Sequence, residues 1–310
     1  MTRTKRTSLL LAWALAAVTL LAGPPSAAAE PAEPAAPTAA LQEVTDFGPN
    51  PTNLRMHLYV PDSVAADPAI LVGLHWCTGT GPDFFNGTQY AALADQYGFV
   101  VVYPSASNAE RCWDVHSEEA LTHDGGSDPQ GIVSMVEYVE RTYGGDPDRV
   151  FATGHSSGGM MTNVLLGSYP DVFRAGSASA GVPFGCFAGE SSWNAECATG
   201  NIIRTPQEWG DLVRAAYPGY EGPRPPMQLW HGTEDDGLYF QNFEEEIKQW
   251  TDVHGVSQTP TTTEPDTPRD NWTRTRYGSG QVEAIRAEGE PHNLPILAEE
   301  VVHFLGLDRT

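Results

Sequence analysis

A serine framed by two glycines is the strongest chemical signal in the sequence. Residues 154–158 read Gly-His-Ser-Ser-Gly, which places Ser156 at the centre of a G-x-S-x-G pattern. Strand-forming residues 149–153 precede the pattern and helix-forming residues 157–169 follow it. A sharp strand-to-helix turn of this kind exposes a nucleophilic serine. The pattern therefore predicts that Ser156 attacks the carbonyl carbon of an ester or a related acyl group.

A serine hydroxyl is a weak nucleophile and needs a basic histidine, which in turn needs an orienting carboxylate. In chains with this turn the partners follow in the order serine, acid, histidine, each after a later strand. Asp235 follows the strand candidate 227–230, and His292 follows the strand candidate 282–286. We therefore predict a catalytic triad of Ser156, Asp235 and His292.

Both partners of the serine have rivals nearby. Glu234 and Asp236 flank Asp235, and the residue pattern alone leaves the choice among the three acids open. His303 lies in the last helix candidate, where we expect a packed or surface residue. His231 precedes the acidic loop, where we expect it to order the turn.

Acyl transfer also needs backbone N–H groups that bind the developing oxyanion. The N–H of Ser157, directly after the nucleophile, is one predicted donor. The second is expected in the loop after the strand candidate 70–75, from Trp76 or Cys77. We favour Cys77, because a disulfide there would hold the loop still.

The N-terminal 29 residues have the layout of a secretory signal peptide. Arg3, Lys5 and Arg6 precede an apolar run at 9–22, and small residues end at Ala29, where cleavage is predicted. The apolar run is shorter than the roughly 20 residues of a membrane-spanning helix. We therefore expect a secreted protein that has no membrane association after signal removal, with a disordered Ala/Pro-rich spacer at 30–41 and one domain at 42–310.

Four cysteines in an exported chain predict two disulfides, with three possible pairings. We favour Cys77–Cys112, which would pin the loop after an early strand. Cys186–Cys197 would close a short Gly/Ser/Trp-rich excursion. No cysteine lies in a metal-ligand pattern, so no metal and no other cofactor is expected.

Short apolar runs alternate with helical patterns along the rest of the chain. The strand candidates are residues 56–60, 70–75, 99–103, 149–153, 175–180, 227–230 and 282–286. The helix candidates are residues 83–97, 128–143, 157–169, 206–216, 239–253 and 295–305. This alternation predicts an α/β fold with one doubly wound, mostly parallel sheet in a single domain.

Two long stretches interrupt the alternation. Residues 182–205 and 217–226 surround one helix candidate, and the Thr/Pro-rich residues 254–278 are expected to form a loop of the same domain. The helix candidate at 128 has a clear start, because Asp128 is a candidate N-cap and a proline follows it.

The charge excludes one class of partner. The chain has 40 acidic against 17 Lys and Arg residues, a formal net charge of -23. A chain this acidic repels phosphate backbones, so we expect no nucleic-acid binding.

Several segments together resemble one family. They read LVGLHWCTGTG, YGFVVVYPSA, GHSSGGMMTNVLLGSYPDVF, GVPFGCFAG followed by WNAEC, PMQLWHGTEDDGLYFQNFEEEIKQW and GEPHNLP. From about Thr52 to Leu307 the chain is similar to carbohydrate esterase family 1 type proteins, which include acetylxylan esterases, feruloyl esterases and polyhydroxybutyrate depolymerases, and most similar to the acetylxylan esterases.

The resemblance implies an α/β-hydrolase fold and favours Asp235 among the three acids. It implies a carboxylic ester hydrolase that removes acetyl groups from xylan or xylo-oligosaccharides through an acyl-enzyme. The polyester-degrading members more often have glycine where Trp76 stands, which argues against a polymer depolymerase. The residues before the base, Glu290-Pro291, also differ from the Val-Gly common in relatives.

Two other functions stay open. A feruloyl esterase or a short-chain polyester depolymerase, such as a polyhydroxyalkanoate depolymerase, would keep the chemistry and change the acyl group. A non-catalytic polysaccharide-binding protein would keep only the fold, and the complete triad pattern argues against it. We expect a monomer that acts on acetylated xylan or another plant cell-wall polysaccharide.

Loop aromatic residues are the candidate sugar contacts, because a flat ring can stack on a sugar face. The candidates are Trp76, Trp113, Trp193 and Tyr239, and His155 could line the site beside them. Glycosylation sequons begin at Asn86 and Asn271.

Overall fold

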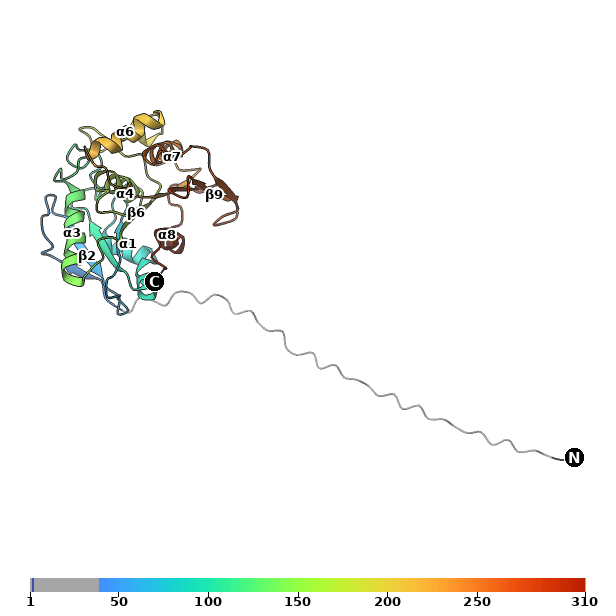
Figure 1. Ribbon diagram of the computed structural model, residues 1–310, viewed down its shortest axis with the longest axis horizontal. Coiled ribbons are helices and arrows are strands. Elements are labelled where there is room, and N and C mark those ends of the chain that lie inside the picture. The colour runs from blue at the N-terminus through green and yellow to red at the C-terminus, as the bar shows by residue number, and fades with distance from the viewer. Residues whose placement is uncertain (1, 3–38, 310) are drawn as a thin grey trace. The chain divides into compact units, whose positions relative to one another are not determined.

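A ten-stranded sheet lies at the centre of the computed structural model, which describes residue 2 and residues 39–309. The strand order is β1-β2-β4-β3-β5-β6-β7-β10-β9-β8. Figure 1 labels β2, β6 and β9 of this sheet. The strands are β1 (Gln42–Val44), β2 (Arg55–Tyr59), β3 (Ile70–Leu74), β4 (Val100–Ser105), β5 (Val150–His155), β6 (Ala175–Ser179), β7 (Met227–Gly232), β8 (Thr262–Pro265), β9 (Trp272–Tyr277) and β10 (Val282–Ala287). The strands from β4 to β10 in this order run parallel, and antiparallel strands extend the sheet at both edges.

Helices cover both faces of this sheet, which explains why its central strands are apolar on both sides. The helices are α1 (Gly81–Gly87), α2 (Tyr90–Tyr97), α3 (Asp128–Tyr143), α4 (Ser157–Ser168), α5 (Ala195–Ala198), α6 (Pro206–Ala216), α7 (Gln241–Val253) and α8 (Ala298–Leu305). One core cluster joins the sheet to α3, α4, α6 and α7. A second cluster joins the opposite face to α1, α2 and α8. This is the doubly wound α/β fold that the sequence predicts.

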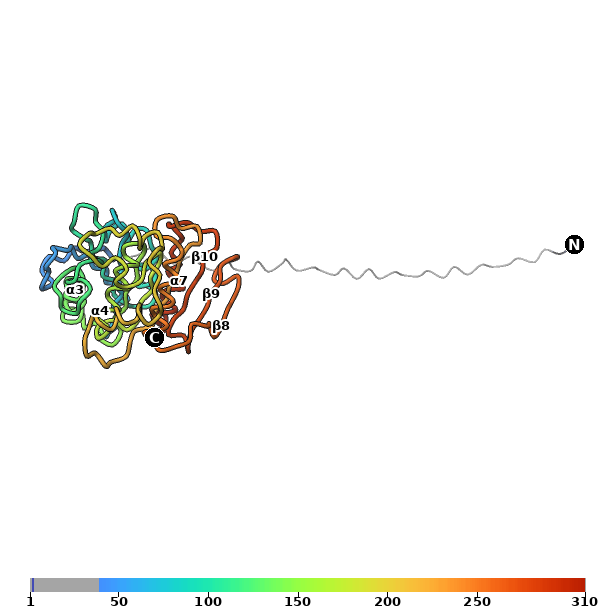
Figure 2. The backbone as a smooth tube through the Cα atoms, turned by 90° about the horizontal axis from the view of Figure 1, so that it is seen from above, coloured from blue at the N-terminus to red at the C-terminus, as the bar shows by residue number. Residues whose placement is uncertain are grey.

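The central strands are buried along their whole length. Every residue of β3 and β4 is buried, and their Val, Leu and Ile side chains alternate between the two clusters. Such continuous apolar runs are typical of parallel strands covered on both faces. Figure 2 shows β8, β9 and β10, in orange to red, on the side of the domain away from α3.

The register of the parallel strands brings five loops to one edge of the sheet. Leu74 at the end of β3 pairs with Gly154 of β5, and His155 of β5 pairs with Ser179 of β6. Gly232 and Ala287 likewise pair at the ends of β7 and β10. The loops that follow these strands therefore emerge side by side, where ligands bind in open α/β sheets.

The structure corrects the predicted loop at 254–278. This segment contains β8 and β9, and β9 pairs antiparallel with β10. The Thr- and Arg-rich residues of β9 alternate, with Trp272 and Arg274 buried and Thr273 half-buried. The strand is therefore a polar strand between β10 and the edge strand β8, and an apolar-run criterion does not detect it.

Two helix predictions also change. The candidate 83–97 is two helices, α1 and α2, with the break at Thr88, which has an extended backbone. In α3 the N-cap is Ser127 rather than Asp128. Asp128 is instead the first helical residue, and its carboxylate accepts the backbone N–H of Asp114 at 2.8 Å.

The predicted signal peptide at 1–29 and the spacer at 30–41 lie outside the described residues, except for residue 2 and residues 39–41. Residues 39–309 belong to one compact unit. Within the described residues, no helix combines the length and apolar character needed to cross a bilayer.

Candidate active site

The candidate nucleophile lies at a strained turn between β5 and α4. Ser156 has φ 57° and ψ -122°, a backbone conformation that a residue with a side chain rarely adopts. A Cβ on Gly154 would lie 2.3 Å from the carbonyl oxygen of Gly158. A Cβ on Gly158 would lie 2.1 Å from the carbonyl oxygen of Leu74. The two glycines of the G-x-S-x-G pattern are therefore required sterically.

The structure brings the three predicted triad residues into one hydrogen-bonded chain. His292 Nε2 lies 2.8 Å from Ser156 Oγ, and His292 Nδ1 lies 2.8 Å from Asp235 Oδ2. Asp235 follows β7 and His292 follows β10, as their places in the sequence predict. With Nδ1 donating to the carboxylate, Nε2 is free to accept the serine proton.

Asp235 is buried and its two oxygens accept four hydrogen bonds. Oδ1 accepts the N–H groups of Gly237 and Leu238, both at 2.8 Å. Oδ2 accepts from His292 and lies 3.1 Å from His231 Nε2. Burial alone would raise the pKa of Asp235, but the hydrogen bonds from His231 and His292 outweigh it and hold this pKa well below its ordinary value. The carboxylate is therefore ionised throughout the neutral range.

The rivals to the triad residues lie elsewhere. Glu234 and Asp236 are exposed, and the carboxylate that contacts the base is that of Asp235. His303 lies in α8, where it pairs with Asp308. His231 is fully buried, and its Nε2 also contacts the carbonyl oxygen of Leu238 at 2.7 Å. The contact of His231 with Asp235 goes beyond the turn-ordering role predicted from the sequence.

The loop after β3 packs directly against the start of α4. A Cβ on Gly158 would also lie 2.8 Å from the carbonyl oxygen of His75. His75 donates Nδ1–H to the carbonyl oxygen of Trp76 at 2.6 Å and accepts the N–H of Ala106 at Nε2. Burial lowers the pKa of His75 to about 4, so the ring is neutral and fixes this loop. The predicted oxyanion donors of Trp76, Cys77 and Ser157 therefore come from two segments in contact.

A cavity of about 430 Å³ lies beside the triad. Its lining residues come from the loop after β3, from α1, from the end of β5 and from the segment after the base: Trp76, Gly87, His155, Asn293, Leu294, Pro295 and Ile296. The ring of His155 lies 5.5 Å from that of His292, and its Nδ1 lies 3.2 Å from Ser179 Oγ. Burial, with the nearby His292, lowers the pKa of His155 to about 3, so this ring is also neutral.

The last four of these lining residues were missed by the sequence analysis. They follow His292 directly, and the helix expected from 295 begins only at Ala298. The signal was available, because the residues next to a predicted catalytic base are natural candidates for a site wall.

The aromatic candidates separate into three groups. Trp76 lines the cavity, whereas Trp193 and Tyr239 are 56% and 45% exposed on other loops. Trp113 is only 3% exposed, and its indole N–H donates to the carbonyl oxygen of His75 at 2.8 Å. The ring of Trp113 is therefore buried beneath the loop that contains His75, and its role as a substrate contact stays a prediction.

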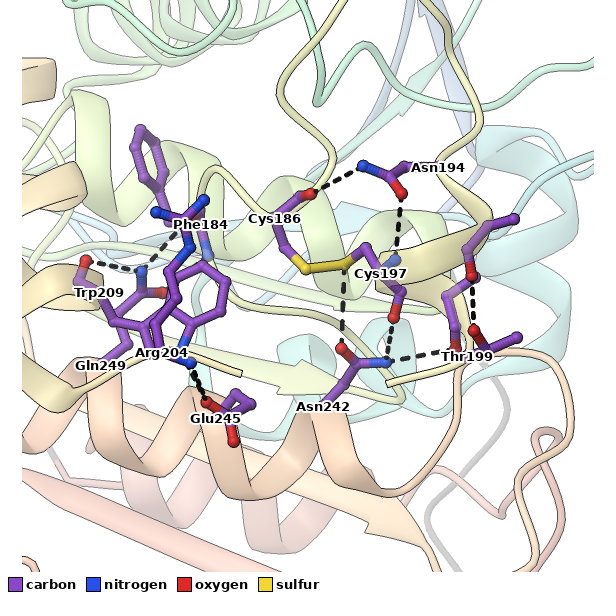
Figure 3. The surroundings of a disulfide bond; sticks show 12 residues. Phe184, Cys186, Asn194, Cys197, Thr199, Arg204, Trp209, Asn242, Glu245 and Gln249 are labelled. Atoms are coloured by element: carbon purple, nitrogen blue, oxygen red, sulfur yellow. Dashed lines mark hydrogen bonds between the residues drawn. A yellow bond between two sulfur atoms is a disulfide. The ribbon is translucent and has the colours of Figure 1, made fainter. Parts of the chain in front are cut away.

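Both favoured disulfides, Cys77–Cys112 and Cys186–Cys197, are present. Figure 3 shows the second, where Asn194 donates to the carbonyl oxygen of Cys186 and accepts the N–H of Cys197. Asn242 of α7 donates to the carbonyl oxygen of Cys197 at 2.9 Å, which fastens this loop to the domain (Figure 3). In residues 39–309 no group of His, Cys, Asp and Glu has the arrangement of a metal site.

A mostly parallel, doubly wound sheet with a serine on its strand-to-helix turn defines an α/β-hydrolase. The chain belongs to the esterase PHB depolymerase family, whose sequence pattern matches residues 54–250.

Curated relatives extend the match over most of the chain. A probable acetylxylan esterase A of Aspergillus flavus is 45% identical over 271 residues, covering 86% of this chain and 88% of the relative. An acetylxylan esterase of Coprinopsis cinerea is 47% identical over 283 residues, covering 89% and 76%. The solved acetyl xylan esterase of Aspergillus awamori has a TM-score of 0.84 at 44% identity, covering 86% of this chain and 99% of that structure. This chain is therefore a carboxylic ester hydrolase.

Proposed function

We propose that the protein is a secreted serine esterase that removes acetyl groups from xylan or xylo-oligosaccharides. The observation that carries the proposal is the position of His292, 2.8 Å from both the Ser156 hydroxyl and the Asp235 carboxylate. The names of relatives at 44–47% identity support acetylated xylan as the substrate.

The proposed reaction uses the triad, two backbone N–H groups and one water molecule. Ser156 Oγ attacks the acetyl carbonyl carbon while His292 Nε2 takes its proton, and Asp235 stabilises the imidazolium. The N–H groups of Ser157 and of Cys77 or Trp76 bind the oxyanion. His292 then gives the proton to the departing sugar hydroxyl, which leaves an acetylated Ser156. A water molecule, activated by the same histidine, releases acetate and restores the serine.

The substrate contacts follow from position and exposure. Trp76 and the neutral His155 line the cavity beside the triad, where the acetylated sugar residue would sit. The exposed rings of Trp193 and Tyr239 offer further stacking surfaces to the polysaccharide chain.

Export is part of the same proposal. Signal cleavage after Ala29 would release a monomer with a spacer at 30–41 and the esterase domain at 42–310. The two disulfides support an oxidising compartment. N-terminal sequencing of the protein from culture medium should begin at Glu30, and recovery of the intact N-terminus would contradict the cleavage.

The catalytic role of Ser156 has a direct test. Ser156→Ala should reduce kcat on p-nitrophenyl acetate by at least about 10⁴-fold, because a triad acts as a unit. A fluorophosphonate should label wild-type protein at one site per chain and fail to label the variant. Ser168→Ala, at the other end of the same helix, serves as the control and should retain activity. Unchanged turnover in Ser156→Ala would refute the mechanism.

The alternative acyl groups need their own comparison, since the family is described by its polyester depolymerases. Initial rates should be measured on acetylated xylan, methyl ferulate and a polyhydroxyalkanoate film. We expect acetylated xylan to be the best substrate. A higher kcat/KM on the ferulate, or faster erosion of the film, would replace the proposed substrate with a feruloyl ester or a polyester.

A further inference from the structure

A buried hydrogen bond joins the nucleophile turn to the loop that follows β4. The backbone N–H of Trp113 donates to Ser157 Oγ at 2.9 Å. Trp113 directly follows Cys112, and Ser157 directly follows the nucleophile. Both residues are buried, so neither group can exchange this bond for one with water. Loss of the Ser157 hydroxyl would therefore leave a buried N–H without a partner.

The same loop is covalently joined to the other predicted oxyanion donor. Cys112 forms a disulfide with Cys77. A short path therefore runs from Cys77 through the disulfide to Cys112, to the next residue Trp113, and across one hydrogen bond to Ser157. Ser157 at one end of this path is an oxyanion donor in the proposed function, and Cys77 at the other end is, with its neighbour Trp76, a candidate for the second donor.

Trp113 also holds the first loop directly. Its indole N–H donates to the carbonyl oxygen of His75 at 2.8 Å, and its ring centroid lies 4.8 Å from the His75 ring. One buried residue thus donates to the segment before Cys77 with its side chain and to Ser157 with its backbone. The spacing of the two segments therefore depends on two hydrogen bonds of Trp113, one from its indole N–H and one from its backbone N–H.

The backbone around the disulfide is unusually constrained. Thr78 and Arg111, which adjoin the two cysteines, have left-handed φ values of 66° and 50°. Such conformations persist in non-glycine residues only where surrounding contacts impose them. Thr78 N–H donates to Glu110 O at 2.8 Å, and the Asn108 side chain bonds both the N–H and the carbonyl oxygen of Cys112. The backbone is therefore held in place on both sides of the disulfide.

We propose that Ser157, Trp113 and the Cys77–Cys112 disulfide form a clamp that sets the distance between the two oxyanion donors. The inference rests on the proposed function and adds a role for a side chain next to the nucleophile. Ser157 and the disulfide are positioning groups, because they act on the reaction through the placement of N–H donors. Misplacement by about 1 Å costs roughly 10²-fold in rate, and loss of a donor costs about 10²–10³-fold.

The first test is Ser157→Ala, with turnover of p-nitrophenyl acetate as the readout. We expect kcat to fall by at least about tenfold while KM stays within about twofold, because the donors act on the transition state. Ser168→Ala is the matched control. This serine is also buried in α4 and donates to the carbonyl oxygen of Val164, far along the helix from the turn. A folded Ser157→Ala protein with wild-type kcat would overturn the clamp.

The second test removes the covalent half of the clamp. Cys77→Ala/Cys112→Ala should also lower kcat by about tenfold, and combining it with Ser157→Ala should cost less than the product of the two losses. Cys186→Ala/Cys197→Ala is the control, and its kcat on this small ester should stay within about twofold. If both cysteine pairs affect kcat equally, or if the combined losses multiply, the clamp is wrong. This comparison decides the matter even if Ser157→Ala does not fold.

Failure of the clamp and failure of the proposed function give different results. If a fluorophosphonate does not label wild-type Ser156, the serine esterase mechanism itself fails. If it labels wild type, and the clamp variants turn over ester as fast as wild type, the mechanism stands and the clamp is refuted. Stoichiometric labelling of slow clamp variants, with reduced labelling rates, is the result that supports both.

Discussion

Each oxygen of the Asp235 carboxylate accepts two hydrogen bonds. These bonds hold the carboxylate in place, and the carboxylate in turn holds the ring of the base His292. The N–H groups of Gly237 and Leu238 set the plane of the carboxylate, and His231 occupies the position on Oδ2 beside His292. His231 Nε2 touches two oxygen acceptors and so carries the hydrogen. A buried carboxylate with all its acceptor positions filled cannot rotate away from the base.

Asp235→Asn tests whether the charge, rather than the shape, of this group matters. The amide can donate to His292 Nδ1, which would put the hydrogen on Nε2 and remove the acceptor for the serine proton. We expect kcat to fall by about 10⁴-fold with little change in KM.

The exposed neighbour supplies the control for this variant. Asp236→Asn should leave kcat within about twofold, since its carboxylate does not contact His292. If Asp236→Asn were the more damaging change, the assignment of the acid would be wrong. Both variants can be compared on p-nitrophenyl acetate at one pH.

Helices α4 and α7 share one apolar core cluster and are also joined by buried polar contacts. Asn163 Nδ2 donates to Glu246 Oε1 at 2.7 Å, and Asn163 Oδ1 accepts the indole N–H of Trp250 at 2.7 Å. Burial raises the pKa of Glu246 to about 8, so its carboxyl group is protonated at neutral pH. Helix α4, which follows the nucleophile, is thus hydrogen-bonded to α7 through the uncharged carboxyl group of Glu246.

The packing of α7 therefore carries a pH dependence. Glu246 ionises near its ordinary pKa of 4.5 in the unfolded chain but near 8 in the folded one. Its stabilising contribution is complete below pH 4.5 and is lost as pH rises towards 8. Glu246→Gln keeps the acceptor for Asn163 and cannot ionise. We expect the variant to exceed wild type in free energy of unfolding by about 4 kcal/mol at pH 8 and to lose this advantage near pH 4.5.

Urea denaturation at several pH values measures this difference. Glu244→Gln is the control, because Glu244 lies on the same helix only two residues from Glu246 and is exposed. An equal gain in both variants would show that net charge, rather than burial of Glu246, is responsible.

The parallel strands and the triad could be predicted because their signals are local. Apolar runs such as β3, the two glycines that frame Ser156 and the order serine, acid, histidine are all readable along the chain. The choice of Asp235 among three adjacent acids comes from the family resemblance. The polar strand β9 could not be predicted this way, because its Thr and Arg residues become a strand only by pairing with β10 and β8.

The same limit applies to single side chains. Trp113 looks like a loop aromatic in the sequence, but its burial depends on His75 and Ser157, which are distant along the chain. Asp128 looks like a helix cap, but its partner is the N–H of Asp114. Non-local hydrogen bonds of this kind decide the role of a polar or amphipathic residue, and no short sequence window contains them.

At the scale of the whole molecule, two disulfides brace a domain whose chain is strongly acidic. They join residues 35 and 11 positions apart, so the first closes the longer loop. Cys77, Cys112 and Cys186 lie in loops and Cys197 lies in the short helix α5, so neither disulfide joins strands of the sheet. The covalent links therefore stabilise the loops, and the sheet depends on its two apolar core clusters.

Removal of the two disulfides should have different costs in stability. The chain-entropy relation gives about 4 kcal/mol for Cys77→Ala/Cys112→Ala and about 3 kcal/mol for Cys186→Ala/Cys197→Ala. Guanidinium denaturation of the two pairs beside wild type measures the difference. A greater loss from the second pair would mean that native contacts, such as those of Asn194 and Asn242, outweigh loop length.

The left-handed backbone conformation of Ser156 exposes the nucleophile but lowers the stability of the folded protein. Holding a non-glycine residue in this conformation costs about 1–3 kcal/mol. The residue that carries this cost is the nucleophile Ser156, and its substitution would abolish turnover. Ser156→Gly should therefore give an inactive protein that melts at a higher temperature than wild type. Because activity requires this strained conformation, the active protein remains below its maximum stability. Its most heat-resistant single variants are therefore to be sought among inactive ones.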